Sequence, residues 1–333
     1  MKKIICSLMF LVLVLTAAGC NNEPEKPKEG EEAQPVKTAV MLDWSINTNH
    51  TGLFVAKEKG YYAEQGLDVE ILEMGEPGPA QLIAADKLDF GVSYQEEVTN
   101  ARAGDIPLVS LAAVIQHNSS GFASLKEANL RLPRDLAGKR YGGWGSPMEH
   151  AVIEAIMKND GADASTVEFV DIGAADFFSV IGKQVDFTWI FYGWDGVRAE
   201  LENIPLNIIM LKDFSEALDY YTPTIITSEK TIQNKPDLVK KFMAATSKGY
   251  EFAITNPAEA AEILLKYAPE LNAELVSESQ KWLSGQYQAD APQWGWQSRD
   301  VWERYASWMY EQELLPKAID VDKAYTNEFL PKG

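Results

Sequence analysis

The patterned part of the chain begins with a short apolar run that stops at an acidic and an aromatic residue. Residues 40–42 are apolar, Asp43 and Trp44 follow, and a polar loop leads to a helical pattern over residues 51–60. That pattern closes at a glycine, the residue type that most readily adopts the left-handed conformation after a helix end. The stretch therefore predicts a strand, a loop and a helix.

Strands and helices alternate through the middle of the chain. The predicted strands are 67–73, 88–92, 108–115, 167–170 and 185–191, and the predicted helices between them are 80–85, 98–103, 148–158 and 174–181. Such alternation favours an α/β fold with parallel, doubly wound sheets. The last third is mostly helical, with helices predicted at 237–255, 257–267, 272–287 and 298–315. Trp282, Trp302 and Trp308 fall at helical spacing there, and we interpret them as core residues.

In open α/β sheets, ligands bind beyond the carboxyl ends of the strands. The residues that follow predicted strands are therefore candidate ligand contacts: Asp43, Trp44, Asn49, Tyr94, Glu97, Gly145, Glu149, Tyr192, Trp194 and Asp195. Two structural alternatives stay open. Trp44 could be an ordinary core residue beside a turn aspartate, and the glycine-rich stretch around Gly145 could be only a tight connection.

The N-terminus has the form of a secretory signal. Two lysines precede the apolar run 4–15, and small residues lead to Cys20. The segment resembles a bacterial lipoprotein signal, in which Cys20 becomes the lipid-carrying first residue of the mature chain, although Ala17 stands where leucine is more usual. The alternative is an uncleaved anchor helix. The charged, proline-bearing residues 20–36 hold few large apolar side chains and predict a disordered tether.

Charge and cysteine content narrow the function. The net charge is −19, and loss of the two lysines within residues 1–19 leaves 28 basic against 49 acidic residues, or −21. Such a surface repels nucleic acid. Cys6 and Cys20 are the only cysteines, so the folded part has no disulfide or thiol nucleophile. The three histidines are not spaced like a metal-binding pair, and we expect neither a metal nor a cofactor.

A folded part of this length suggests two lobes. We expect the chain to divide into a signal peptide (1–19), a tether (20–36), a first lobe built from 37–122 plus 226–333, and a second lobe of 123–225. Residues 220–227 are expected to carry the chain back to the first lobe.

Several stretches together resemble a known family: 42–44 with His50, 56–69, 87–91, 136–139 and 325–330. They are similar to the periplasmic-binding-protein-like family that joins solute-binding lipoproteins of bacterial thiamine-precursor ABC transporters with fungal hydroxymethylpyrimidine phosphate synthases. The resemblance implies a two-lobed type II fold with parallel sheets flanked by helices and a helical C-terminal part. The synthases use a lysine-bound pyridoxal phosphate and a histidine, and Ser93 and Glu97 stand at those positions here. Neither can repeat that chemistry, so we expect no enzyme.

The resemblance implies a solute-binding lipoprotein that captures a thiamine-related aminopyrimidine, such as formylaminopyrimidine, for uptake and thiamine salvage. The expected partners are an ABC permease and its ATPase. The protein is expected to be a monomer, held by its lipid at the extracytoplasmic face of the membrane. Aromatic side chains would stack on the ring and carboxylates would accept from its amino group. The alternatives are a sulfonate or oxyanion binder, which the acids disfavour, and an enzyme related to the thiamine-pyrimidine synthases.

Overall fold

The computed structural model describes residues 34–173 and 175–332. The predicted signal segment, Cys20 and the tether up to residue 33 lie outside these ranges. The described residues from Pro35 onward belong to one compact unit. Within them, no helix has both the length and the apolar character that crossing a membrane requires.

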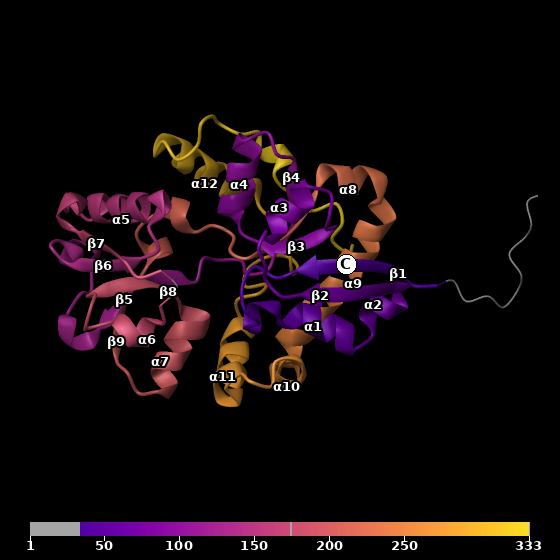
Figure 1. Cartoon of the computed structure of the whole chain (residues 1–333), viewed down its shortest axis with the longest axis horizontal. Coiled ribbons are helices and arrows are strands. Elements are labelled where there is room, and N and C mark those ends of the chain that lie inside the picture. Colours follow the sequence, from indigo (N-terminus) through magenta and orange to yellow (C-terminus); the bar gives the residue numbers. More distant parts are fainter. Residues whose placement is uncertain (1–33, 174, 333) are drawn as a thin grey trace, which may run out of the picture. The chain divides into compact units, whose positions relative to one another are not determined.

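The first sheet has five strands in the order β2-β1-β3-β10-β4 (Figure 1). Its strands are β1 (Val36–Met41), β2 (Leu67–Leu72), β3 (Phe90–Ser93), β4 (Leu108–Ala113) and β10 (Thr224–Ser228). β1 pairs in parallel with β2 and β3, whereas β10 is antiparallel to β3 and β4. Strand β2 shows the alternation of its sequence, because Leu67 and Val69 are buried and Asp68 and Glu70 are exposed.

The second sheet also has five strands, in the order β7-β6-β8-β5-β9. Its strands are β5 (Ser120–Leu125), β6 (Arg140–Gly143), β7 (Glu168–Asp171), β8 (Phe187–Phe191) and β9 (Leu206–Met210). β6 pairs in parallel with β7 and β8, whereas β5 is antiparallel to β8 and β9.

The predicted α/β architecture is observed with one correction, because both sheets are mixed rather than parallel. The antiparallel strands are β5 and β10, the two strands that follow the passages between the sheets. No α-helix precedes β5 after β4 ends at Ala113, so the chain enters the second sheet at the edge where Phe191 ends β8. A strand that enters at that edge must run opposite to its neighbours, because a parallel pairing needs a crossover connection.

The two passages, residues 114–119 and 211–223, join the carboxyl edges of the two sheets. Six residues span at most about 20 Å when fully extended, so the first passage keeps Ala113 and Ser120 close. The lobe boundaries themselves stay a prediction. The predicted return of the chain through residues 220–227 agrees with β10, which begins at Thr224 in the first sheet.

Helices flank both sheets. Their bounds are α1 (Thr51–Glu58), α2 (Tyr61–Glu64), α3 (Pro79–Ala84), α4 (Gln95–Ala103), α5 (Pro147–Asn159), α6 (Phe177–Val180), α7 (Val197–Leu201), α8 (Glu229–Asn234), α9 (Pro236–Thr255), α10 (Pro257–Tyr267), α11 (Ala273–Ser284) and α12 (Arg299–Glu311). α11 and α12 end earlier than predicted. Gly285 follows α11, and Glu313 has a positive φ of 58°, which turns the chain out of helical geometry after α12.

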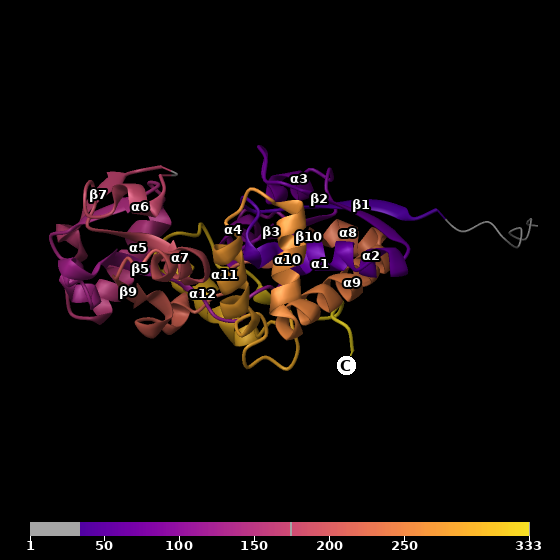
Figure 2. The ribbon, with the colours of Figure 1, turned by 90° about the horizontal axis from the view of Figure 1, so that it is seen from below.

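The C-terminal helices complete the cores of both sheets. α9 and α10 pack against α1 (Figure 2). On α12, Trp302 packs with side chains of the first sheet, whereas Tyr305 and Trp308 pack with those of the second sheet. The core interpretation is confirmed for Trp302 and Trp308, which are buried; Trp282 is half-buried.

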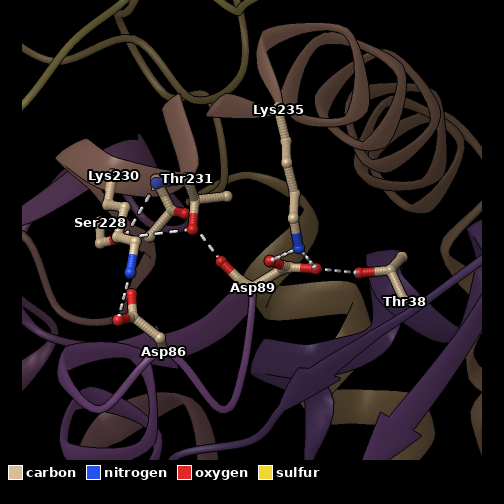
Figure 3. A network of polar contacts seen from close by, with 8 residues as sticks. Thr38, Asp86, Asp89, Ser228, Lys230, Thr231 and Lys235 are labelled. Atoms are coloured by element: carbon tan, nitrogen blue, oxygen red, sulfur yellow. Dashed lines mark hydrogen bonds and ion pairs between the residues drawn. The ribbon is translucent and has the colours of Figure 1, made fainter. Parts of the chain in front are cut away.

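Polar side chains at the amino edge of the first sheet pair with one another (Figure 3). Lys235 Nζ lies 2.7 Å from Asp89 Oδ1, and Thr38 donates to Asp89 Oδ2 at 3.3 Å. Lys230 pairs with Asp86 at 2.6 Å. These contacts tie the C-terminal helices to the strands, so this edge has a structural role and the opposite edge is the candidate for a ligand.

Candidate ligand-binding site

Large aromatic side chains stay exposed where the central strands end. Trp44 (56% exposed) and Tyr94 (37%) follow β1 and β3, Trp144 (53%) follows β6, and Phe191 (40%) is the last residue of β8. Trp44 is therefore not a core residue. Single exposed apolar residues are ordinary, but flat rings gathered at one kind of location indicate a binding surface. The carboxyl edges of both sheets thus present faces on which an aromatic ligand can stack.

Asp43 is held by His50 at the end of β1. His50 is fully buried, and its Nε2 lies 2.8 Å from Asp43 Oδ1. The backbone N–H of Asn47 donates to His50 Nδ1 at 3.3 Å, so the ring proton sits on Nε2 and is donated to Asp43. Asp43 Oδ2 makes no hydrogen bond within the described ranges, and the Asp43 side chain is 20% exposed. One carboxylate oxygen is thereby positioned and the other can accept from a ligand.

The loop from Trp44 to His50 is anchored through its main chain. Tyr250 on α9 donates to the carbonyl of Asn49 at 2.8 Å, and Tyr287 donates to the carbonyl of Thr48 at 2.5 Å. The Asn49 side chain is half-buried and makes no hydrogen bond among the residues that the structure describes. Asn49 therefore keeps both its amide donors and its acceptor for a ligand.

Three acids gather around Tyr94 at the end of β3. The Ser93 hydroxyl donates to the carboxyl of Glu97. Burial raises the pKa of Glu97, and the nearby Asp43 charge raises it further. Burial also raises the pKa of Glu96, to about 7, with a further contribution from Glu97. The pKa of the Tyr94 phenol is raised by burial and by all three carboxylates, so these groups share one environment.

Glu149 has a structural role that the sequence analysis did not predict. Its carboxylate accepts from the Tyr141 hydroxyl at 2.7 Å and from the backbone N–H of Ser146 at 2.8 Å and of Trp144 at 3.1 Å. The side chain is buried and closes a capping box at the start of α5. Glu149 therefore fixes the turn that presents Trp144 and is not offered to a ligand. Gly145, at a φ of 81°, gives that turn its shape.

The π-helical turn Tyr192–Gly196 contacts α11 as well as its own sheet. The Tyr192 ring lies 5.1 Å from that of Trp282, and its hydroxyl donates to Glu200. Trp194 is half-buried and packs against the core of the first sheet. This turn therefore supports the site more than it exposes stacking surface, in contrast to the expectation for Tyr192 and Trp194.

Asp195 stands at the carboxyl end of β8, and its Oδ2 accepts from the Phe191 N–H at 3.3 Å. Burial raises its pKa to about 6. The neighbouring Arg198 is already paired with Asp176 at 2.6 Å and with Glu202 at 2.7 Å. In the part of the chain that the structure describes, Asp195 therefore forms no ion pair, as expected for a group that accepts from a neutral donor.

Sequence reasoning missed four residues of this region: Trp144, Phe191, Glu96 and Thr224. Trp144 and Phe191 carried a usable signal, since both mark strand ends as Trp44 does. Nothing in the sequence shows that Glu96 is shielded from water, or that Thr224 on β10 is the direct partner of Ser93 on the adjacent strand β3. Within residues 34–173 and 175–332, no three His, Cys, Asp or Glu side chains are grouped as a metal site requires.

The fold is that of periplasmic binding proteins. The structure is similar to the alkanesulfonate-binding protein SsuA from Xanthomonas axonopodis pv. citri bound to MOPS, with a TM-score of 0.67 and 17% sequence identity. The match covers 89% of this chain and 99% of that chain. It confirms the predicted periplasmic-binding-protein-like fold.

The chain belongs to the NMT1/THI5-like family, whose model matches residues 47–260. It is 29% identical to the formylaminopyrimidine-binding protein of Halalkalibacterium halodurans, over 96% of this chain and 97% of that protein. It is 26% identical to the 4-amino-5-hydroxymethyl-2-methylpyrimidine phosphate synthase of Legionella pneumophila subsp. pneumophila, over 89% of this chain and 92% of that protein. The family resemblance drawn from the sequence motifs is confirmed, and the relatives of this chain include both a binding protein and a synthase.

Proposed function

We propose that this chain is the solute-binding protein of an ABC importer and that it captures an aminopyrimidine for thiamine salvage, with formylaminopyrimidine as the expected ligand. The observation that carries the proposal is the set of exposed rings at the strand ends, Trp44 and Tyr94 from the first sheet and Trp144 from the second. A flat heterocycle bound between these two edges would stack on a ring of the first sheet with one face and on a ring of the second sheet with the other. Carboxyl groups at the strand ends, Asp43 and Asp195 among them, then accept from N–H groups of the ligand.

The acids argue against an anionic ligand. Asp43, Glu96 and Glu97 act together on Tyr94, and the one basic side chain bonded to any of them among the described residues is His50, which pairs with Asp43. A sulfonate or nitrate would meet uncompensated negative charge there instead of the arginines or backbone donors that such ligands need. The similarity to a sulfonate-binding protein therefore supports the fold and not the ligand.

The chain lacks the lysine amine that the synthase alternative requires. Ser93 stands at the end of β3 with its hydroxyl bonded to Glu97, and a serine cannot form a Schiff base with pyridoxal phosphate. We therefore propose a binding protein without catalytic residues. Its partners are the permease and ATPase of the importer, and a lipid on Cys20 holds it at the extracytoplasmic face of the membrane.

Mass spectrometry of the purified protein tests the function. After incubation with formylaminopyrimidine, the proposal predicts one ligand per chain, recovered unchanged on denaturation. An aliphatic sulfonate at the same concentration should leave no adduct. Incubation with pyridoxal phosphate followed by borohydride reduction should leave residue 93 unlabelled. Conversion of the pyrimidine, or retention of the sulfonate instead, contradicts the proposal.

A further inference from the structure

A fully buried hydroxyl without a partner lies at the carboxyl edge of the first sheet. Thr224 is the first residue of β10, its side chain is 0% exposed, and its Oγ1 makes no hydrogen bond within the described part of the chain. Buried polar atoms are nearly always paired, so each exception needs an explanation. Because β10 is antiparallel to β3, its first residue lies at the edge where β3 ends.

The strand register places the Thr224 side chain beside that of Ser93. Thr224 is the direct partner of Ser93 in the β10–β3 pair, and directly opposed residues project from the same face of a sheet. The Ser93 hydroxyl on that face donates to the Glu97 carboxyl. Two buried hydroxyls and a carboxyl on the first turn of α4 are thus gathered on one face.

Glu96 adds a second carboxyl from the same turn of α4. It has no hydrogen bond or ion pair among the described side chains, and burial raises its pKa to about 7, with Glu97 contributing. The groups that act on it or that it acts on are Glu97 on α4, Tyr94 just before α4, Tyr220 before β10, and Tyr305 on α12. No basic side chain offsets either glutamate in this part of the structure. Burial and the neighbouring charge of Glu97 therefore favour the protonated form of Glu96.

The basic side chains of the surrounding elements do not act on Glu96 or Glu97. Arg102, at the other end of α4, pairs with Glu229 at 2.6 Å. Arg304 on α12 is exposed, and its charge acts on Tyr221 and not on either glutamate; His50 is bonded to Asp43. Charge at the start of α4 is therefore balanced by protons or by a ligand.

We propose that Ser93, Glu96, Glu97 and Thr224 form a subsite that binds the amino-bearing edge of the pyrimidine and shares one proton with it. This inference rests on the proposed function. An aminopyrimidine presents an N–H donor beside a ring-nitrogen acceptor. A protonated carboxyl presents a carbonyl acceptor beside an O–H donor, which matches that edge, whereas a carboxylate offers only acceptors. The Thr224 hydroxyl pairs with the polar group that enters beside Glu97.

Because the complex retains this proton, ligand binding should weaken as the pH rises. The complex needs the proton on Glu96, and the free protein begins to lose that proton as the pH rises through about 7. Affinity is therefore level just below pH 7 and falls above it, by up to about tenfold per pH unit. A ligand held by carboxylates alone would show the opposite trend, since ionisation of the acids would favour it.

Calorimetric titration with formylaminopyrimidine tests the buried hydroxyl. Thr224→Val keeps the shape of the side chain and should weaken binding about tenfold, while the thermal midpoint stays the same or rises because an unpaired hydroxyl has been removed. Ser247→Ala is the matched control, since Ser247 Oγ on α9 is also buried and has no partner among the described residues. It should leave affinity unchanged. Unchanged affinity in Thr224→Val overturns the subsite.

Glu96→Gln tests the proton independently and serves if the valine variant does not fold. Its amide keeps a donor beside an acceptor and cannot ionise. We expect affinity within about threefold of the unaltered protein at pH 6.5 and no loss between pH 7 and 9. Weakened binding at every pH, or a pH dependence like that of the unaltered protein, overturns the subsite. If the unaltered protein binds the pyrimidine and neither variant differs from it, only the subsite fails; if it binds none, the proposed function fails as well.

Discussion

The hydroxyl of Thr48 lies 2.6 Å from the hydroxyl of Ser279, and Ser279 in turn donates to the backbone carbonyl of Gly193. Thr48 belongs to the loop that carries Trp44, Ser279 to α11, and Gly193 to the turn after β8. Both hydroxyls are buried. A two-step hydrogen-bond chain thus connects the binding loop of the first sheet with the strand-end turn of the second.

A double-mutant cycle should measure this chain. Ser279→Ala removes the hydrogen-bond partner of the buried Thr48 hydroxyl and one donor to the Gly193 carbonyl, so we expect a loss of about 1–3 kcal/mol in the free energy of unfolding. Combined with Thr48→Ala, the effects should be less than additive by about 0.5–1.5 kcal/mol in denaturant melts. Ser284→Ala on the same helix is the control, because among residues 34–173 and 175–332 its hydroxyl bonds only to the Lys281 carbonyl. Strict additivity would show that Thr48 and Ser279 are not coupled.

Close packing behind the binding loop gives a second prediction. A Cβ at Gly52 would lie 2.2 Å from the ring of Tyr250, whose hydroxyl donates to the Asn49 carbonyl. Gly52→Ala should therefore reduce the unfolding free energy by about 1–3 kcal/mol and weaken ligand binding through displacement of the loop. Gly75→Ala, which meets open space, should change neither. Equal stability of the two variants in denaturant melts would contradict the packing described for α1 and α9.

His117 joins the two passages between the sheets. Its Nδ1 lies 2.7 Å from Asp219 Oδ2 and its Nε2 lies 3.1 Å from Asp290 Oδ1. The hydrogen bond with Asp219 raises the pKa of His117 above its ordinary value, with Asp290 adding to the effect. The stabilisation is therefore complete below about pH 6.5 and is lost as the pH rises through the raised pKa.

His117→Gln should reveal this pH window. The variant should unfold more easily than the unaltered protein at pH 6, and the difference between the two should shrink by pH 9, where the imidazole no longer carries its charge. Denaturant melts at both pH values provide the measurement. A difference that stays constant or grows with pH would mean that His117 is not held as an imidazolium.

Local patterns predicted the strand ends well and the tertiary roles poorly. The Asp43–Trp44 element follows from an apolar run that stops at a polar loop, and both residues lie at the predicted edge. Glu149 carries the same kind of signal, but an acid three residues after Ser146 also closes a capping box, which the structure shows. Mixed pairing was missed because strand direction depends on where the chain enters a sheet. The exposure of each ring could not be predicted from the sequence. Trp144 is exposed and Tyr192 is half-buried because of tertiary packing, which a local sequence pattern does not reveal.

The N-terminal proposal has its own test. Cys20→Ser removes the site of lipid attachment, so the protein should leave the membrane fraction and appear in the soluble extracytoplasmic fraction. Its affinity for the pyrimidine should be unchanged, because the predicted tether separates Cys20 from the folded part. Fractionation with immunodetection provides the measurement. Continued sedimentation of the serine variant with membranes would contradict the lipid anchor.

The stacking role of Trp44 separates binding from stability. The ring is 56% exposed, so Trp44→Ala should leave the unfolding free energy nearly unchanged while weakening pyrimidine binding by about 1–3 kcal/mol, the scale of one lost stacking contact. Trp144→Ala should behave in the same way. Tyr310→Ala is the matched control, because this ring on α12 is 49% exposed and does not follow a strand.

The measurement that tests the central claim most directly is a calorimetric titration of the unaltered protein and of Trp44→Ala with formylaminopyrimidine, beside denaturant melts of both. The account predicts one ligand per chain, a weaker Kd in the variant and the same melting midpoint. No binding by the unaltered protein, or equal affinity in the variant, would contradict the claim that the strand-end aromatic residues hold a pyrimidine.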